Sequence, residues 1–338
     1  MPDLTDIGFG AMLPQGWRIE LKDIDDPIQK YERMTRVAQE AEAANFDSLW
    51  VVDHFHNAPS TGVDAMFECW TSLAALARDT QRIRLGQLVT CNSYRHPALL
   101  AKMAACVDVI SHGRLILGIG AGWYQDEYEA YGLPFPKTLE RLEMMGEAVA
   151  LIKEMWTAEH PAFSGRYYSL REPMNEPRPV QQPHPPIWIG GMGEKITLRL
   201  VAEFADACNL YGTPEVIGRK LSILGDHCRD VGRESQSVLK TAFLTVILGD
   251  QTEIQRVTKQ VERRVGSFEA GVEGNVLAGD AEHVAEKLLE YVRLGISYFI
   301  LYVPHSWEGG HFARFSEQVV PLLSRSVRSM SGRVIGET

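Results

Sequence analysis

Eight apolar runs with the character of strands alternate with helix-like runs along almost all of the 338 residues. The runs are nearly continuously apolar, as in strands buried on both faces of an all-parallel sheet, whereas half-exposed strands alternate between apolar and polar residues. Most neighbouring runs are far enough apart for one helix to connect them. The expected strands are Asp6–Leu13, Ser48–Val52, Ile83–Thr90, Leu115–Gly120, Ile187–Ile189, Asp206–Leu210, Leu239–Leu248 and Tyr298–Val303.

This alternation predicts an α/β protein built as one (β/α)8 barrel, a TIM barrel. The spacing is larger after the fourth and seventh strands, so we expect insertions at about 157–186, with a hairpin-like stretch, and at about 251–279. Both should lie over the C-terminal mouth as lids. We expect a single domain over 1–338 with a polar C-terminal tail at about 325–338, because no change in composition divides the chain. An open doubly wound sheet is the alternative, but it favours a single glycine fingerprint near the N-terminus, which is missing here.

The composition argues against several classes of partner. A formal charge of −10, spread along the chain, disfavours nucleic acid. No run reaches the roughly 18 apolar residues of a membrane span, and the N-terminus has neither the basic nor the apolar region of a signal peptide. The five cysteines are scattered and form no CxxC pair. We therefore expect buried thiols in a reducing cytoplasm, with no disulfide frame and no zinc site.

Residues 186–212 form a complete unit of strand, glycine turn, helix and strand. The fifth strand ends in Gly190-Gly191-Met192-Gly193, and a helical segment is expected from Glu194. Backbone N–H groups and the positive end of the helix dipole can meet an anion at such a point. A tight turn alone needs only one or two of these glycines, so we favour phosphate binding somewhat over a merely tight turn.

The second strand ends in Asp53-His54-Phe55-His56, and strand ends face the active site in such barrels. An Asp-His pair suits general acid–base catalysis because histidine titrates near neutral pH. We therefore take His54 and Asp53 as candidate catalytic residues, although Asp53 could be purely structural and His56 is undecided. His54 and His56 could also begin a metal site, but the other strand ends lack the further ligands it needs, and we expect no metal.

The fourth strand ends in glycines at 118, 120 and 122, followed by Trp123. No helix follows directly, so a dinucleotide fingerprint is weakly supported. Bare glycines would let a flat ring such as an isoalloxazine approach the backbone, and close helix packing explains them equally well. Glu68 is expected to begin its helix near the positive end of the dipole. The chain has no P-loop and no GxSxG motif, so NTP hydrolysis and serine-hydrolase chemistry have no support.

In this order on eight strands, the segments resemble the bacterial luciferase-like superfamily of flavin barrels, and within it the branch that uses the deazaflavin coenzyme F420. The resemblance extends from Ile7 to about Leu323. The segments that carry it are Leu49–His54, Arg84–Thr90, Tyr94–Lys102, Gly118–Trp123 and Ile189–Lys195.

The resemblance implies that F420 binds at the barrel mouth, with FMN as the alternative cofactor. It places a non-prolyl cis peptide bond at Leu88-Val89, behind the cofactor ring, and assigns proton exchange to His54. The cofactor phosphate would lie against Ala121-Gly122 and the fifth-strand turn, with Lys195 as a source of charge. The implied cofactor-binding residues are Asp53, Leu88, Val89, Thr90, Ala121, Gly122, Gly190, Gly191, Met192 and Gly193.

One position departs from the F420-dependent sugar-phosphate dehydrogenases of this branch. By the resemblance, those enzymes have a catalytic glutamate just after the fourth-strand glycines. This chain has Trp123 there. Tryptophan cannot transfer that proton, so we expect Trp123 to shape an apolar substrate pocket or to pack under the lid. The resemblance then implies an F420-dependent oxidoreductase that moves a hydride between ring C5 and a small organic substrate, in the direction of reduction by F420H2, as a homodimer. The alternatives are an FMN-dependent monooxygenase and a non-catalytic flavin- or deazaflavin-binding protein.

Overall fold

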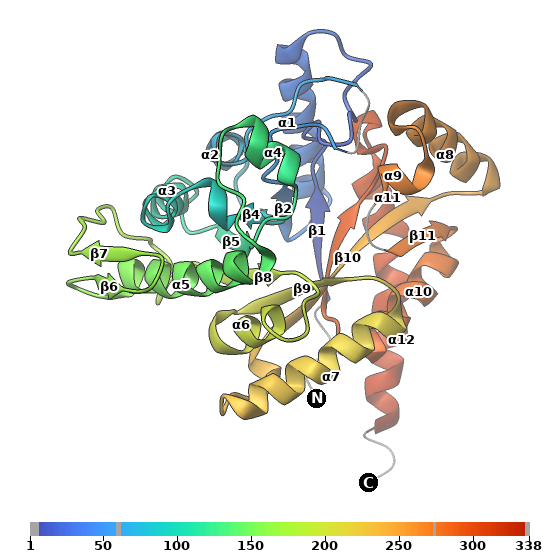
Figure 1. Ribbon diagram of the computed structural model, residues 1–338. Coiled ribbons are helices and arrows are strands. Elements are labelled where there is room, and N and C mark those ends of the chain that lie inside the picture. The colour runs from blue at the N-terminus through green and yellow to red at the C-terminus, as the bar shows by residue number, and fades with distance from the viewer. Residues whose placement is uncertain (1–6, 59–61, 273–274, 335–338) are drawn as a thin grey trace.

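The computed structural model describes residues 7–58, 62–272 and 275–334. Within these ranges eight parallel strands close into a barrel, because the first strand pairs with both the second and the last (Figure 1). The (β/α)8 barrel predicted from the sequence is therefore confirmed. In order round the barrel the strands are β1 (Gly8–Met12), β2 (Ser48–Val51), β3 (Arg84–Gln87), β5 (Leu115–Gly120), β8 (Ile187–Gly190), β9 (Ala207–Tyr211), β10 (Leu239–Leu248) and β12 (Tyr298–Tyr302).

Helices cover the outside of the barrel, and side chains fill its inside. Every residue of β2 and β5 is buried, which explains why these runs are apolar without alternation. Among the described residues, no helix is long and apolar enough to cross a membrane. The longer helices are α1 (Pro27–Ala43), α2 (Cys69–Asp79), α3 (Pro97–Ile110), α5 (Thr138–Thr157), α6 (Thr197–Phe204), α7 (Pro214–Asp230), α8 (Gln251–Val265), α10 (Ala281–Arg293), α11 (His311–Gln318) and α12 (Val320–Val334).

Trp50 fills the middle of the barrel. It is fully buried, and its ring centroid lies 4.8 Å from that of Trp188. A Cβ atom on Gly10 or Gly86 would lie 2.3 or 2.5 Å from the Trp50 ring, so these glycines make room for it. The packed indoles form a floor, and the polar strand ends lie above it at the C-terminal mouth.

The third strand is interrupted at the mouth. β3 ends at Gln87, a cis peptide bond joins Leu88 to Val89, and the short strand β4 (Thr90–Cys91) then pairs with β5. The continuous strand expected to Thr90 is therefore broken. The cis bond lies where the resemblance placed it.

The insertion at 157–186 meets the segment after β4 through Tyr168, whose hydroxyl accepts from Asn92 at 3.4 Å and whose ring lies 5.5 Å from that of His96. It contains the expected hairpin, β6 (Ala162–Ser164) and β7 (Ser169–Arg171), which lies along α5 and away from the mouth helices α4 (Gln125–Ala130) and α8 (Figure 1). Its later part reaches the opposite end of the barrel. There the Gln181 side chain bonds Arg84 and the carbonyl of Leu115, the first residues of β3 and β5.

The insertion at 251–279 reaches the mouth through α8, α9 (Phe268–Gly271) and β11 (Asn275–Gly279). β11 is a strand that the sequence analysis missed; it pairs with the second half of the long strand β10. Arg18, which follows β1, donates a hydrogen bond to the carbonyl of Ala270 in α9. The polar tail expected from about 325 is also corrected, since α12 continues through those residues to Val334; residues 335–338 lie outside the described ranges.

Candidate functional site

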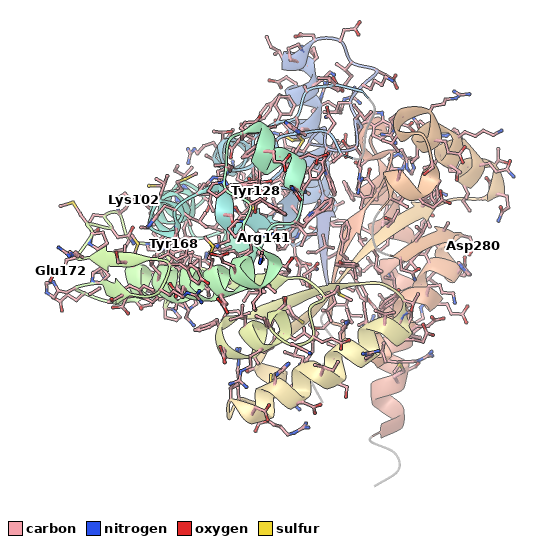
Figure 2. The ribbon with its side chains drawn as sticks, in the orientation of Figure 1. Lys102, Tyr128, Arg141, Tyr168, Glu172 and Asp280 are labelled. Carbon is pink, nitrogen blue, oxygen red and sulfur yellow. The ribbon has the colours of Figure 1, made fainter. Side chains whose placement is uncertain are left out.

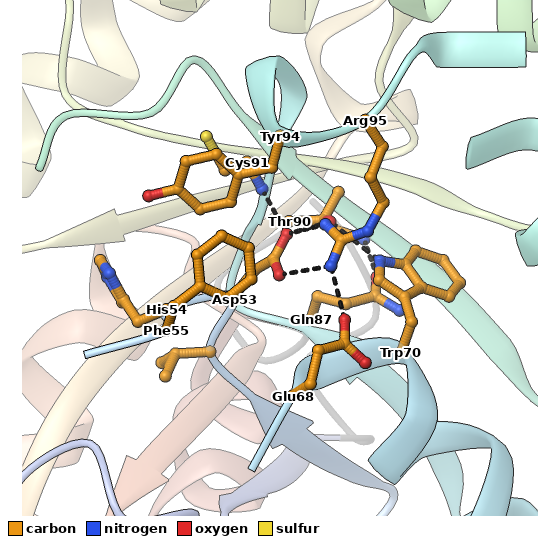
Figure 3. A network of polar contacts seen from close by, with 12 residues as sticks. Asp53, His54, Phe55, Glu68, Trp70, Gln87, Thr90, Cys91, Tyr94 and Arg95 are labelled. Carbon is orange, nitrogen blue, oxygen red and sulfur yellow. Dashed lines mark hydrogen bonds and ion pairs between the residues drawn. The ribbon is translucent and has the colours of Figure 1, made fainter. Parts of the chain in front are cut away.

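Asp53 follows β2 and is 3% exposed. Its carboxylate accepts hydrogen bonds from the hydroxyl of Thr90 (2.7 Å), from the N–H of Cys91 (2.9 Å) and from both terminal nitrogens of Arg95 (2.6 and 3.0 Å). Figure 3 shows this network, in which the Asp53 carboxylate faces Arg95 and the His54 ring is turned away from it. The Asp53–His54 contact expected from the sequence is therefore corrected: the partner of Asp53 is Arg95.

Arg95 also donates to Glu68, at 2.5 Å. Glu68 is the N-cap residue of α2 and accepts from the N–H of Thr71, as expected from its position. The Asp53–Arg95–Glu68 chain thus ties the two ends of the segment between β2 and α2 to the segment after β4.

His54 instead pairs with Glu127 of α4. The Nδ1 atom of His54 lies 2.8 Å from Oε2 of Glu127, which is completely buried. The ring is stacked on Trp17 at 4.8 Å with only 4° between the planes, and Trp123 lies edge-on at 5.8 Å. These contacts fix the imidazole plane and leave Nε2 without a hydrogen-bond partner among the described residues.

Glu127 was missed in the sequence because it belongs to an acidic run, 126–129, in what was taken as a polar loop. Asp126 and Glu129 are exposed, whereas Glu127 and Tyr128 are fully buried. Burial would raise the pKa of Glu127, but hydrogen bonds from His54, Tyr94 and the His56 N–H outweigh it and hold the pKa below its usual value. Burial and the neighbouring carboxylate raise the pKa of Tyr94, which therefore stays a hydrogen-bond donor.

Val89 lies between the ends of the fourth and fifth strands. A Cβ atom on Gly120 would lie 2.5 Å from Cγ2 of Val89, and one on Gly190 would lie 2.8 Å from its Cγ1. Only glycine fits at both positions. The wall of the mouth at this point is therefore the Val89 side chain, packed directly on the main chain of these two strand ends.

Gly122 continues this wall with φ = +78°, a conformation that favours glycine. A Cβ atom there would lie 2.1 Å from the Tyr128 hydroxyl. The Gly122 carbonyl accepts from Nε of Arg141 at 3.3 Å, and Figure 2 shows Tyr128 and Arg141 near one another at this loop. Two neighbouring side chains thus hold the loop after β5.

The Gly190–Gly193 turn leads into α6, which begins at Thr197 and not at Glu194 as predicted. Gly191 has φ = +135°, and Met192 accepts a weak bond from the N–H of Tyr211 at 3.5 Å. The Glu194 carboxylate is drawn away to Lys220 (2.7 Å) and Arg219 (3.1 Å) of α7. It therefore adds no acceptor to the turn, while Lys195 is exposed beside it. The phosphate role of this turn stays a prediction.

His56 donates its backbone N–H to Glu127, and its ring lies 5.6 Å from that of Tyr131. In residues 7–58, 62–272 and 275–334, no three His, Cys, Asp or Glu side chains are placed to hold a metal ion. All five thiols are free; four are buried and Cys106 is partly exposed.

An open groove of about 1450 Å³ lies outside the barrel, along the starts of α8 and α10 and against α11 and α12. It contains none of the strand-end residues above. A small apolar cavity is closer to them. It is lined mainly by Met12, Leu13, Trp17, Val52, Phe243 and Tyr302.

Residues 9–261 match the model of the family described as luciferase-like monooxygenase. The chain is 27% identical over 321 residues to the F420-dependent glucose-6-phosphate dehydrogenase of Microbacterium testaceum, covering 84% of this chain and 91% of the relative.

Two solved structures share the fold. An F420-dependent secondary alcohol dehydrogenase, in complex with an F420-acetone adduct, superposes with a TM-score of 0.76 over 94% of this chain and 99% of the other, at 19% identity. The EDTA monooxygenase of Chelativorans sp. BNC1 superposes with a TM-score of 0.79 over 95% and 94%, at 18% identity. At these identities the likeness shows the fold alone, and dehydrogenases and monooxygenases share it.

Proposed function

This chain belongs to the luciferase-like monooxygenase family, and on that premise we propose that it is an F420-dependent oxidoreductase. It transfers a hydride between the cofactor and an uncharged organic carbonyl compound, in the direction of reduction by F420H2. The observation that carries the proposal is His54, whose Nδ1 pairs with Glu127 and whose Nε2 has no hydrogen-bond partner among the described residues. The relative from Microbacterium testaceum is named as F420-dependent, and this chain matches it over 91% of its length. This match supports F420 over FMN as the cofactor.

The residues at the mouth fit this cofactor. Val89 packs on the main chain of Gly120 and Gly190, so the wall of the mouth here is a small apolar surface against which a flat ring can lie. We assign the ring to this wall, backed by Leu88 and Val89, and the phosphate to Ala121, Gly122 and the Gly190–Gly193 turn. When bound, F420 supplies the hydride-bearing carbon, C5 of its deazaflavin ring.

His54 handles the proton. Reduction of a carbonyl adds a hydride to carbon and a proton to oxygen, and protonated His54 can donate that proton from Nε2 while Nδ1 stays bonded to Glu127. In the reverse direction the same nitrogen accepts the hydroxyl proton. Asp53 takes no part in this transfer, since Arg95, Thr90 and Cys91 occupy its oxygens.

The mouth favours an uncharged substrate over a sugar phosphate. Trp123, 63% exposed, stands where the sugar-phosphate dehydrogenases have their glutamate. Glu127 does not replace that glutamate, because it is buried and its oxygens already accept four hydrogen bonds. Two arginines near the mouth also have guanidinium groups that are already engaged: Arg95 by the carboxylates of Asp53 and Glu68, and Arg141 by the carbonyls of Gly122 and Pro136.

A paired binding titration tests the proposal. The purified protein is titrated with F420 and with FMN, and the oxidation of F420H2 is then followed with apolar ketones and without oxygen. We expect F420 to bind, FMN to bind weakly, and ketone to be required for oxidation. Tight FMN binding without F420 binding, or oxygen consumption with reduced FMN, would instead identify the FMN-dependent monooxygenase.

His54→Ala separates an enzyme from a cofactor carrier. The variant should retain F420 and lose about 100-fold or more in turnover, as expected when a general acid is removed. His56→Ala is the matched control, because its ring packs on Tyr131 and not on His54. Turnover that is equal in both variants would point to a binding protein without proton chemistry.

We also propose that the enzyme is a cytoplasmic homodimer, which is the family expectation. An exposed Leu99 on α3, at 54% exposure, marks one apolar outer face that a second copy could cover. Light scattering of the purified protein should return twice the 37.8 kDa chain mass. A monomer mass would remove this part of the proposal.

A further inference from the structure

The Glu127 carboxylate lies at the centre of a set of four donors. Oε1 accepts from the backbone N–H groups of Phe55 (2.8 Å) and His56 (2.9 Å). Oε2 accepts from the hydroxyl of Tyr94 (2.6 Å) and faces Nδ1 of His54 (2.8 Å). Both oxygens are thus saturated by groups from the loops after β2 and β4. The carboxylate has no freedom to rotate away.

An ionised carboxylate is an acceptor only. The nitrogen that faces it must carry a hydrogen, so neutral His54 holds its hydrogen on Nδ1 and a lone pair on Nε2. The parallel stack on Trp17, at 4.8 Å, holds the plane of the ring, and the hydrogen bond from Nδ1 to Glu127 selects between its two flipped orientations. When Nε2 gains a proton, the adjacent anion stabilises the imidazolium.

We infer that Glu127 is the positioning residue of this site: it fixes the His54 tautomer, aims Nε2 at the mouth and stabilises the charged ring between proton transfers. The catalytic part of this inference rests on the proposed function of His54. The role belongs to Glu127 and not to Asp53, which is tied to Arg95. Glu127 also comes from the segment that carries Trp123. One segment therefore supplies both the indole ring that lies edge-on to His54 and the carboxylate that accepts the hydrogen of Nδ1.

The substitution Glu127→Gln gives a sharp test. If the amide oxygen faced His54, its NH2 group would face the N–H groups of Phe55 and His56, leaving two buried donors unpaired at about 1–3 kcal/mol each. The amide oxygen will therefore turn to those N–H groups. Its NH2 then faces Nδ1 of His54, which must become an acceptor. The hydrogen moves to Nε2.

Nitrogen-15 NMR of the histidine rings reads this tautomer in the protein without cofactor. We expect Nδ1–H for neutral His54 in the wild type and Nε2–H in Glu127→Gln, with the His54 signal identified by its loss in His54→Gln. Glu129→Gln, an exposed acid on the same helix, should leave the wild-type tautomer. An Nε2–H tautomer in the wild type would overturn the inference by itself. The test therefore still decides if the Glu127 variants fail to fold.

Kinetics supply the second readout. Glu127→Gln should lower kcat about 100-fold or more with a smaller change in KM. Glu127→Asp should recover part of the rate. An unchanged tautomer and an unchanged kcat in Glu127→Gln would reduce Glu127 to a structural residue. If the tautomer shifts as expected but no variant or wild type oxidises F420H2, the proposed function fails and the Glu127–His54 assignment stands.

Discussion

Arg95 donates one hydrogen bond to each carboxylate oxygen of Asp53, at 2.6 and 3.0 Å. The Asp53 side chain is fully buried and that of Arg95 is 11% exposed. A bidentate pair of this kind holds both groups in one orientation. Asp53 therefore acts as the anchor that joins the loop after β2 to the start of β4, and His54 is positioned from its other side by Glu127.

Replacing Asp53 with alanine should therefore lower the free energy of unfolding, without removing a group that transfers a proton. Arg95 would keep its contact with Glu68, but it would lose its bidentate partner, and Thr90 and Cys91 would lose their acceptor. Each buried donor left unpaired costs about 1–3 kcal/mol. Urea unfolding measures this loss. The control is Asp226→Ala, which breaks an exposed Asp226–Arg229 pair with 57% and 74% side-chain exposure and should cost less than about 1 kcal/mol. Equal losses in the two variants would contradict the anchoring role.

The pattern of strands could be predicted because each strand is recognisable from its own few consecutive residues. Buried strands are apolar throughout, and the polar residues that end them, such as Asp53 and His54, stand out from the sequence. The partners of those residues could not be predicted, because 42 residues separate Asp53 from Arg95 and 73 separate His54 from Glu127. Nothing in the acidic run at 126–129 marks which carboxylate is buried.

The two insertions show the same limit. Their lengths follow from the spacing of the strands, and the hairpin at 162–171 follows from local residues. Their positions depend on where the preceding element ends. The first insertion leaves the end of α5, touches the segment after β4 through Tyr168, and returns past Gln181 to the starts of β3 and β5. The second leaves the C-terminal end of β10 and so reaches the mouth.

Gly122→Ala should weaken cofactor binding. The new Cβ atom would lie 2.1 Å from the Tyr128 hydroxyl and 2.6 Å from the Cys91 sulfur, which pushes both side chains and the loop after β5. The left-handed conformation at φ = +78° adds about 1–2 kcal/mol of strain. Fluorescence titration should show reduced F420 affinity, and urea unfolding should show reduced stability.

Gly132→Ala separates the effect of the left-handed backbone from the effect of the clash between the new Cβ atom and its neighbours. Gly132 also has positive φ, at +66°, but a Cβ atom there would meet nothing within 4 Å. This variant should lose only the conformational term and keep the F420 affinity of the wild type. If both variants bind F420 equally well, the loop after β5 is not part of the cofactor site.

Trp123→Ala should reduce kcat/KM for apolar ketones by about 10-fold or more, since an aromatic contact buries a large apolar area. Its 63% exposure predicts little change in the free energy of unfolding. Met174→Ala is the matched control. Met174 is 84% exposed in the insertion at the other end of the barrel, and its removal should change neither quantity. Efficient turnover of glucose 6-phosphate by the wild type would contradict the assignment of Trp123 to an uncharged substrate.

His305, just after β12, is 1% exposed, and neither ring nitrogen has a hydrogen-bond partner within the described part of the chain. Its ring lies 3.9 Å from that of His311, and Nε2 is 3.6 Å from Glu253. Burial, followed by repulsion from His311, lowers the pKa of His305 from 6.5 to about 3. Glu308 and Glu253 act in the opposite direction but do not offset the burial, because Arg256 already pairs with both of them.

The stability of the protein should therefore fall in acid through His305. The unfolded chain binds a proton at this residue as the pH drops below 6.5, whereas the folded protein does not until about pH 3. The contribution is complete above pH 6.5 and is lost as the pH falls through that window, at up to about 1.4 kcal/mol per pH unit. Urea unfolding at several pH values should give His305→Asn a shallower slope than the wild type by this amount. His160→Gln, whose side chain is 76% exposed, should keep the wild-type slope, and a wild-type slope in His305→Asn as well would show that His305 is not the buried titrating group.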